Sequence, residues 1–271
     1  MIVDTLSLIH EAVMVGARIV MSQYQTNFSV STKSNPQDFV TEVDIACQSA
    51  IAESITSQLV DRGVERSTIG FIGEESLFSA AEHLFVIDPI DGTSSFVMGN
   101  NQGAFCISVA YVHKGVVQAG VVYDPLHKVL FTAESGKGAT KVEAGKTEQL
   151  TSMSSMQDTL SVAYTLGSDS ETKLKTAALV EKCTKAGFSV ERTRSCIVTL
   201  ASVIAGNEYQ VAVCGAAYVW DLAAVSLILF EAGAALRSWD GSAVQLQWEN
   251  PNTAYAVVSG NQVDIERLVA L

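Results

Sequence analysis

The sequence predicts an α/β protein built from layers of helices and strands. Apolar residues recur at helical spacing from Leu6 to Val20, and short apolar runs separated by turn residues fill 69–132. From 172 onward, helix-length and strand-length segments alternate. With 271 residues and 48% hydrophobic content, the chain has enough apolar material for one large domain or two closely packed halves, and we expect a single folded unit.

The first half is predicted to contain two helices followed by a sheet with hairpins. The first helix follows the apolar spacing of 6–20, and the polar segment 26–38 with Pro36 is expected to be a loop. Asp44 is expected to open the second helix, which continues to about Leu59. Strands are expected at 69–72, 84–87, 104–111, 116–123 and 129–132.

The second half is predicted to alternate between helices and strands. Helices are expected near 172–185, 199–205, 221–232 and 263–270, and strands at 189–193, 209–213 and 254–258. Gly187, Gly206 and Gly233 follow three of these helices as stop signals. The polar stretch 135–155 predicts the boundary between an N-terminal subdomain, 1–150, and a C-terminal subdomain, 151–271.

Charge and composition narrow the classes of partner and compartment. The formal net charge is −12, and the absence of any Lys or Arg block argues against a nucleic-acid polymer as partner. Five cysteines without a C-x-x-C pair indicate a reducing compartment. No window reaches the roughly 20 apolar residues of a membrane helix, and no secretory leader pattern opens the chain. We therefore expect a cytoplasmic protein with no membrane partner.

The segment Val86–Thr93 carries the most informative motif. Asp88 and Asp91 stand three residues apart after an apolar run, and Pro89 is expected to end the strand there. Two carboxylates on one turn provide the oxygen ligands that hard divalent cations prefer. Gly92 permits close backbone approach, and Thr93 can cap a following helix whose unpaired N–H groups suit an anion. The alternative is an ordinary acidic turn.

Acidic residues at three further sites favour a metal site over that alternative. Glu74 and Glu75 follow a short apolar run, Asp44 lies at a predicted helix start, and Asp221 begins an apolar helix. Taken singly, Glu75 reads as a solvated carboxylate, and Asp44 and Asp221 read as helix caps. Together with the Asp88–Asp91 turn, they predict an acidic cluster that binds cations and a small phosphorylated substrate.

These segments resemble the inositol monophosphatase family of metal-dependent, lithium-sensitive phosphatases. The matching stretches are Asp38–Asp44, Gly73–Ser76, Asp88–Thr93 and Trp220–Ala224. The resemblance implies an α-β-α-β-α sandwich of the type shared with fructose bisphosphatases. It also implies a magnesium-dependent phosphomonoesterase with two to three Mg²⁺ ions per site, and a homodimer.

The resemblance further implies a role for each matched residue. One magnesium ion would bind Glu74, Asp88 and the carbonyl of Ile90, and a second would bind Asp88, Asp91 and Asp221, with a third, weaker ion near Glu74. Glu74 and Thr93, the latter paired with Asp44, would orient the attacking water. The amides of Gly92 and Thr93 would hold the phosphate.

The substrate side departs from the inositol pattern. In the family segment G-T-x-N-F-x-H-G, the Asn and His are replaced by Ser95 and Met98. The family segment G-S-A corresponds to Arg194, Ser195 and Cys196, and a Glu that contacts inositol hydroxyls corresponds to Cys214. The predicted substrate-binding residues are Asp91, Arg194, Ser195, Cys196 and Cys214.

Several substrates therefore stay open. Inositol monophosphate or a related sugar or polyol phosphate comes first, followed by histidinol phosphate, fructose 1,6-bisphosphate and 3′-phosphoadenosine 5′-phosphate. Arg194 is either a ligand for an anionic substrate group or a surface residue at a strand end. Tyr218 and Trp220 either stack on a substrate ring or belong to the core. A less favoured alternative is a phosphometabolite-binding protein without turnover.

Overall fold

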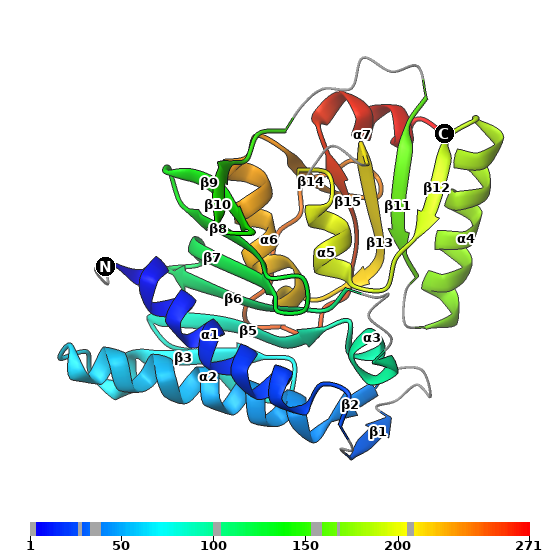
Figure 1. Cartoon of the computed structure of the whole chain (residues 1–271). Coiled ribbons are helices and arrows are strands. Elements are labelled where there is room, and N and C mark those ends of the chain that lie inside the picture. The colour runs from blue at the N-terminus through cyan, green and yellow to red at the C-terminus, as the bar shows by residue number, and fades with distance from the viewer. Residues whose placement is uncertain are drawn as a thin grey trace.

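An eight-stranded sheet and a five-stranded sheet lie between layers of helices (Figure 1). The computed structural model describes residues 4–26, 29–32, 39–99, 104–152, 159–166, 169–204 and 209–271. Asp38, which opens the first predicted motif, and Gly206, the predicted end of a helix, lie outside these residues.

The first layer is a pair of helices, α1 (Thr5–Gln23) and α2 (Glu42–Asp61), beneath the larger sheet (Figure 1). They cross closely at Gly16, where an added Cβ would lie 2.7 Å from Ile51 Cδ1. Among the described residues, α1 is the one helix long and apolar enough to span a membrane. Its apolar face is buried in the core formed with α2 and the sheet, which is what a core helix requires.

Helix α2 begins earlier than the sequence predicts. Thr41 is its N-cap, and its hydroxyl accepts the backbone N–H of Asp44 at 3.3 Å. The Asp44 carboxylate in return accepts the N–H of Thr41 at 2.8 Å, which completes a capping box. Asp44 is therefore the third residue of the helix rather than its cap, and its position is fixed by the helix start.

The larger sheet has the order β10-β9-β8-β7-β6-β5-β3-β4. Its strands are antiparallel except for the neighbours β3 and β5, which run parallel. The bounds are β3 (Ile69–Gly73), β4 (Leu77–Ser79), β5 (His83–Asp91), β6 (Cys106–His113), β7 (Val116–Asp124), β8 (Val129–Glu134), β9 (Gly138–Glu143) and β10 (Lys146–Gln149). A short 3₁₀ helix, η1 (Arg66–Thr68), precedes β3.

The prediction that Pro89 ends the strand is wrong. Strand β5 continues to Asp91, and its register with β6 shifts between Asp88 and Asp91. A bulge leaves residues outside the ladder, so a proline that lacks an N–H is tolerated there. The same bulge directs the two carboxylates of the motif toward one site.

Two other segments differ from the sequence-based expectation. The predicted linker 135–155 contains β9 and β10, and the predicted loop 26–38 contains β1 (Val30–Thr32), which pairs with β2 (Phe39–Thr41). Strand β10 is exposed along its length, so its polar sequence resembles a loop. The division into subdomains 1–150 and 151–271 stays a prediction.

The middle layer consists of α5 (Cys196–Ala201) and α6 (Val219–Glu231), which lie between the two sheets (Figure 1). Helix α6 approaches β7 at Gly120, where an added Cβ would lie 3.0 Å from the Ala224 backbone. The buried residues of both sheets and of these helices form one continuous core. This core places the first turn of α6 beside the end of β5.

The five-stranded sheet and two outer helices complete the layers (Figure 1). The sheet order is β12-β11-β13-β15-β14, with helices α4 and α7 on its outer face. The bounds are β11 (Ser161–Thr165), α4 (Ser170–Lys185), β12 (Ser189–Arg192), β13 (Val211–Ala217), β14 (Ala235–Ser238), β15 (Tyr255–Gly260) and α7 (Gln262–Val269). The predicted α-β-α-β-α layering is confirmed.

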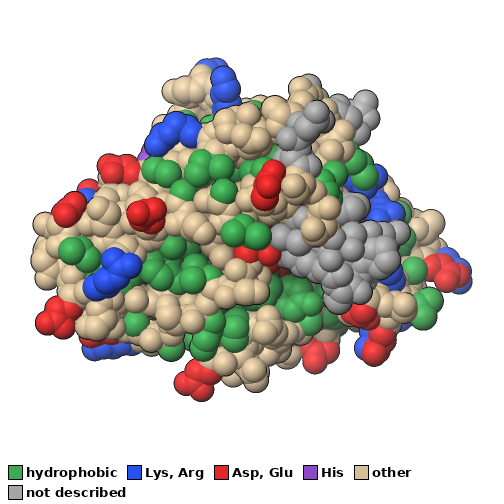
Figure 2. All heavy atoms as spheres, turned by 90° about the horizontal axis from the view of Figure 1, so that it is seen from below, with side chains coloured by type: hydrophobic (Ala, Val, Ile, Leu, Met, Phe, Trp, Pro, Cys, Tyr) green, Lys and Arg blue, Asp and Glu red, His purple; other side chains and the backbone are tan. Residues whose placement is uncertain are grey.

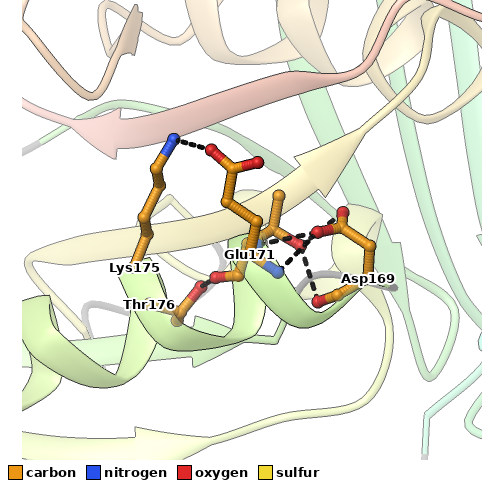
Figure 3. Close-up of polar contacts among 5 residues, drawn as sticks. Asp169, Glu171, Lys175 and Thr176 are labelled. Atoms are coloured by element: carbon orange, nitrogen blue, oxygen red, sulfur yellow. Dashed lines mark hydrogen bonds and ion pairs between the residues drawn. The ribbon is translucent and has the colours of Figure 1, made fainter.

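The start of α4 shows why this helix begins at Ser170, two residues before its predicted start (Figure 3). The Asp169 carboxylate accepts the backbone N–H groups of Thr172 at 2.9 Å and Glu171 at 2.8 Å. The bonds from Thr172 are the main reason that the pKa of Asp169 is lowered. One turn later, Lys175 pairs with Glu171 at 2.7 Å.

The face formed by α1 and α2 carries separated groups of hydrophobic side chains among polar and acidic ones (Figure 2). Exposed large apolar residues of these helices include Met21, Ile45 and Val60. Scattered apolar side chains of this kind are common on protein surfaces. We therefore attach no binding function to this face.

Candidate active site

The parallel pairing of β3 and β5 places two carboxylates side by side. Gly73 is paired with Ile87, so the next residues of the two strands, Glu74 and Asp88, are neighbours. The backbone N–H of Glu74 also donates to the Ile87 carbonyl at 3.3 Å. A hydrogen bond between the two carboxyl groups contributes to the raised pKa of Asp88.

Three aspartates converge next to this pair. Oxygen atoms of Asp88, Asp91 and Asp221 lie within 4.8 Å of one another, and all three residues are buried. Asp88 and Asp91 come from the two sides of the β5 bulge, and Asp221 comes from the first turn of α6. The Asp221 carboxylate accepts the Tyr218 N–H at 2.5 Å, which fixes its orientation.

The electrostatics of this acidic cluster favour a cation. Burial raises the pKa of Asp88 well above its ordinary value, and the charges of Glu74 and Asp91 raise it further. Burial also raises the pKa of Asp221, with added repulsion from Asp91. Buried carboxylates are costly unless a cation compensates them. A site whose donors are carboxylate oxygens fits Mg²⁺ better than a soft metal.

The predicted Asp44–Thr93 pair is present in the structure. The prediction that Thr93 caps the helix is wrong, because Gly92 is the N-cap and Thr93 is the first residue of α3 (Thr93–Met98). The Thr93 hydroxyl instead lies 3.2 Å from Asp44 Oδ1 and 2.9 Å from the carbonyl oxygen of Ile90. Asp44 is fully buried. Hydrogen bonds of Thr93 thus connect α2, the β5 bulge and α3. The assignment of Ile90 as a metal ligand stays a prediction.

Gly92 occupies a position that requires glycine. Its φ is +87°, and an added Cβ would lie 2.8 Å from the Ala104 carbonyl oxygen. A side chain would therefore strain the backbone and press on the neighbouring chain. The turn can place the first residues of α3 beside Asp91, although the roles of Gly92 and Thr93 in phosphate binding remain predictions.

Asp91 has a second role that the sequence did not reveal. Its carboxylate accepts the backbone N–H groups of Ile197 at 2.7 Å and Cys196 at 3.1 Å, and the Ser195 hydroxyl also bonds to it. These bonds lower the pKa of Asp91, but burial outweighs them and the pKa is raised. Asp91 thus links the β5 bulge to the start of α5.

The other predicted substrate residues lie near the bonds between Asp91 and the start of α5. Arg194 is exposed and directly precedes the Ser195 hydroxyl that bonds to Asp91. Cys196 and Cys214 are buried, with their Sγ atoms 2.7 Å apart. Burial and the neighbouring Cys214 thiol raise the pKa of Cys196 well above its usual range. The structure therefore gathers these residues beside Asp91.

Two aromatic residues flank the start of α6. The rings of Tyr218 and Trp220 are stacked with centroids 5.0 Å apart. Trp220 belongs to the core between the sheets, and Tyr218 packs against that core. Of the two alternatives for these rings, the packing supports a core role for Trp220.

Sequence reasoning missed Gln48. This residue of α2 is 4% exposed, and its carboxamide bonds to the backbone of Glu75 through both of its ends. A glutamine one turn after Asp44 carries no recognisable signal in a single sequence. The role of Gln48 becomes visible only in the structure, where α2 lies beside the end of β3.

Comparisons with known proteins show which sequences this chain resembles. The sequence model of the inositol monophosphatase family matches residues 4–270. A Thermotoga maritima protein named fructose-1,6-bisphosphatase/inositol-1-monophosphatase is 30% identical over 79% of this chain and 76% of its own length. A Nus factor SuhB from Pasteurella multocida is 31% identical over 78% of this chain and 76% of its own.

Solved structures show the same fold. An IMPase from Thermotoga maritima aligns with a TM-score of 0.81 and 24% identity, covering 98% of this chain and 96% of its own. An IMPase/NADP phosphatase, solved as a complex with Mg²⁺ and phosphate, aligns with a TM-score of 0.75 and 22% identity, covering 98% and 95%. On the match across nearly its whole length, the chain belongs to the inositol monophosphatase family.

Proposed function

We propose that this protein is a magnesium-dependent phosphomonoesterase that hydrolyses a small phosphorylated metabolite with water as the nucleophile. The observation that carries the proposal is the convergence of Asp88, Asp91 and Asp221 within 4.8 Å, beside Glu74. This buried acidic cluster would repel a phosphate unless cations reversed its local charge. Family membership adds the expectation of phosphatase chemistry.

The acidic residues of the chain would bind the magnesium ions. Asp88, Asp91 and Asp221 would hold the ions, with Glu74 completing the set beside Asp88. Bound magnesium would lower the pKa of a coordinated water and neutralise phosphate charge.

The hydroxyl of Thr93 would orient the water. The buried Asp44 carboxylate lies 3.2 Å from that hydroxyl and would accept a hydrogen bond from it. The hydroxyl oxygen of Thr93 could then accept a hydrogen bond from the water, and Glu74 would accept the proton that the water loses. The turn at Gly92 would present α3 to the phosphate. These residues would supply a base and a positioned hydrogen-bond acceptor for the water, so no covalent nucleophile is required.

The names of relatives, rather than the substrate-side residues, favour a small sugar or polyol phosphate. The Thermotoga relative is named for both fructose 1,6-bisphosphate and inositol monophosphate, and one structural neighbour is named an NADP phosphatase. Arg194 is exposed next to Ser195 and would suit a second anionic group of the substrate. Inositol monophosphate, histidinol phosphate, fructose 1,6-bisphosphate and 3′-phosphoadenosine 5′-phosphate are therefore the substrates to compare.

The proposal includes two to three Mg²⁺ ions per site, inhibition by lithium, a homodimer and a cytoplasmic location. A second candidate function is binding without turnover, because relatives include proteins named Nus factor SuhB. The complete set of Asp44, Glu74, Thr93 and the three aspartates favours catalysis over that alternative.

The test is phosphate release from the four substrates, with magnesium or with a chelator. We expect at least one substrate to be hydrolysed and the chelator to abolish the reaction. Asp221→Asn should abolish turnover while the protein stays folded, because the asparagine oxygen can still accept the Tyr218 N–H. Asp91→Asn is a poorer variant, since it would weaken the bonds to the start of α5.

Asp240→Asn is the matched control, because Asp240 is exposed and, among the described residues, its carboxylate bonds within its own turn, accepting the Ser242 N–H at 2.9 Å. It should keep wild-type turnover. Full activity of Asp221→Asn would refute the metal assignment. A folded, magnesium-saturated wild type that hydrolyses none of the substrates would favour the binding protein.

A further inference from the structure

The carboxamide of Gln48 is bonded to the backbone at the edge of the acidic cluster. Its Nε2 donates to the Glu75 carbonyl at 3.1 Å, and its Oε1 accepts the Glu75 N–H at 3.0 Å. A side chain that satisfies both the N–H and the C=O of one residue holds that residue as a neighbouring strand would. Because Gln48 is 4% exposed, water cannot readily replace these bonds.

The space around Gln48 is closed on the side of β3. An added Cβ at Gly73 would lie 2.2 Å from Gln48 Oε1 and 2.6 Å from its Cδ. Glycine at 73 therefore gives the carboxamide room to lie against the strand end. The fit is specific to the tip of Gln48, since the nearest atoms to that Cβ belong to the carboxamide.

Glu74 lies between two fixed points. On one side its own N–H donates to the Ile87 carbonyl of β5, directly before Asp88. On the other side the next residue, Glu75, is held by Gln48. The turn is then closed by the Ser76 N–H, which donates to the Glu74 carbonyl at 3.0 Å, with Ser76 at a φ of +57°.

We propose that Gln48 is a positioning residue that holds the Glu74 carboxylate against Asp88 and so sets the affinity for magnesium. This inference rests on the proposed function. Helix α2 carries Asp44 one turn before Gln48, and Asp44 lies 3.2 Å from the Thr93 hydroxyl. One rigid helix thus positions both the Thr93 side and the Glu74 side of the site. Outer partners of metal ligands commonly control affinity in this way.

The test is magnesium binding by isothermal titration calorimetry without substrate, comparing the wild type with Gln48→Met. Methionine keeps the length of the side chain but makes neither bond to Glu75. We expect the Kd for Mg²⁺ to rise about 10-fold or more. In phosphate release, the half-saturating magnesium concentration should rise in parallel, and saturating magnesium should restore most of kcat.

Gln58→Met is the matched control, because Gln58 lies on the same helix and, within the part of the chain that the structure describes, its carboxamide bonds to Ser54, at 3.3 Å, and not to the acidic cluster. It should keep the wild-type Kd. If Gln48→Met does not fold, Gly73→Ala provides the second measurement. Its Cβ would displace the Gln48 carboxamide, so it should also weaken magnesium binding.

Two results would overturn the proposal. One is a Kd of Gln48→Met equal to that of Gln58→Met. The other is a lower unfolding temperature in chelator with an unchanged Kd, which would make Gln48 a purely structural residue. A wild type that binds no magnesium would overturn the proposed function along with this inference, whereas the first two results leave the proposed function intact.

Discussion

Replacing Asp88 by asparagine should stabilise the metal-free protein at neutral pH and remove its response to magnesium. Asp88 is 1% exposed and shares its site with Asp91 and Asp221. Asparagine has nearly the same volume, and its oxygen can still accept the Ile90 N–H that now lies 3.1 Å from Asp88 Oδ1. The change therefore removes a charge without opening a cavity.

The distances between the three aspartates determine how strongly their charges repel one another. Two unit charges at the limiting separation of 4.8 Å repel each other by about 3.5 kcal/mol at an effective dielectric constant of 20. Three such pairs amount to about 10 kcal/mol, which is comparable to the whole stability of a typical domain. The metal-free cluster must therefore keep at least one proton at a pH where the unfolded chain has lost it.

The sign of the pH dependence follows from the raised pKa of Asp88. The cluster is least destabilising below the ordinary aspartate pKa of 3.8, and stability is lost as pH rises from there through the raised folded pKa. Each proton retained in the folded state contributes a slope of about −1.4 kcal/mol per pH unit. Two pH units then correspond to about 2.7 kcal/mol.

The assay is urea unfolding in chelator between pH 5 and pH 7, roughly the window just above the unfolded carboxylate pKa. The wild type should lose stability with rising pH, and Asp88→Asn should show a much smaller slope. Magnesium at 100 times its Kd should stabilise the wild type by about 2.7 kcal/mol and leave the variant unchanged. Asp240→Asn should behave as the wild type. A wild-type stability independent of both pH and magnesium would refute the reasoning.

Three further substitutions test other parts of the account. Thr93→Val removes the hydroxyl beside Asp44, so kcat for phosphate release should fall about 100-fold or more with magnesium binding retained by calorimetry; unchanged kcat would contradict this. Gly16→Val adds a branched side chain where a Cβ alone would lie 2.7 Å from Ile51 Cδ1. It should cost about 1–3 kcal/mol in urea unfolding, and an unshifted midpoint would argue against the helix crossing. Gly92→Ala should cost about 1–2 kcal/mol through its positive φ, measured in the same way.

Sequence reasoning reached the layered fold because helical spacing and strand-like runs are local signals. Sequence reasoning was wrong about strand ends and edge strands, because these depend on pairing between strands. Pro89 ends an isolated strand pattern, yet β5 continues because the bulge opposite β6 needs no N–H there. Strand β10 was taken for a linker because an exposed edge strand has the composition of a loop.

The candidate site was predictable only where its residues form a recognisable sequence motif. Asp88, Asp91 and Thr93 stand together in the chain. Asp44, Glu74 and Asp221 were visible as acidic positions at predicted helix starts and a strand end, and the resemblance gave them roles. The bond from Ile197 to Asp91 joins residues 106 positions apart, and no local pattern indicates it. Gln48 was missed for the same reason, because its partner lies 27 positions away.

Manganese anomalous diffraction would show whether the three aspartates bind a metal ion. Crystals of the wild type grown with Mn²⁺, a hard cation that can replace Mg²⁺ at oxygen ligands, should show anomalous density at carboxylate oxygens of Asp88, Asp91 and Asp221. Crystals of Asp221→Asn should lose or weaken that density. The absence of manganese from this cluster at saturating concentration, or its binding only elsewhere on the surface, would contradict the account.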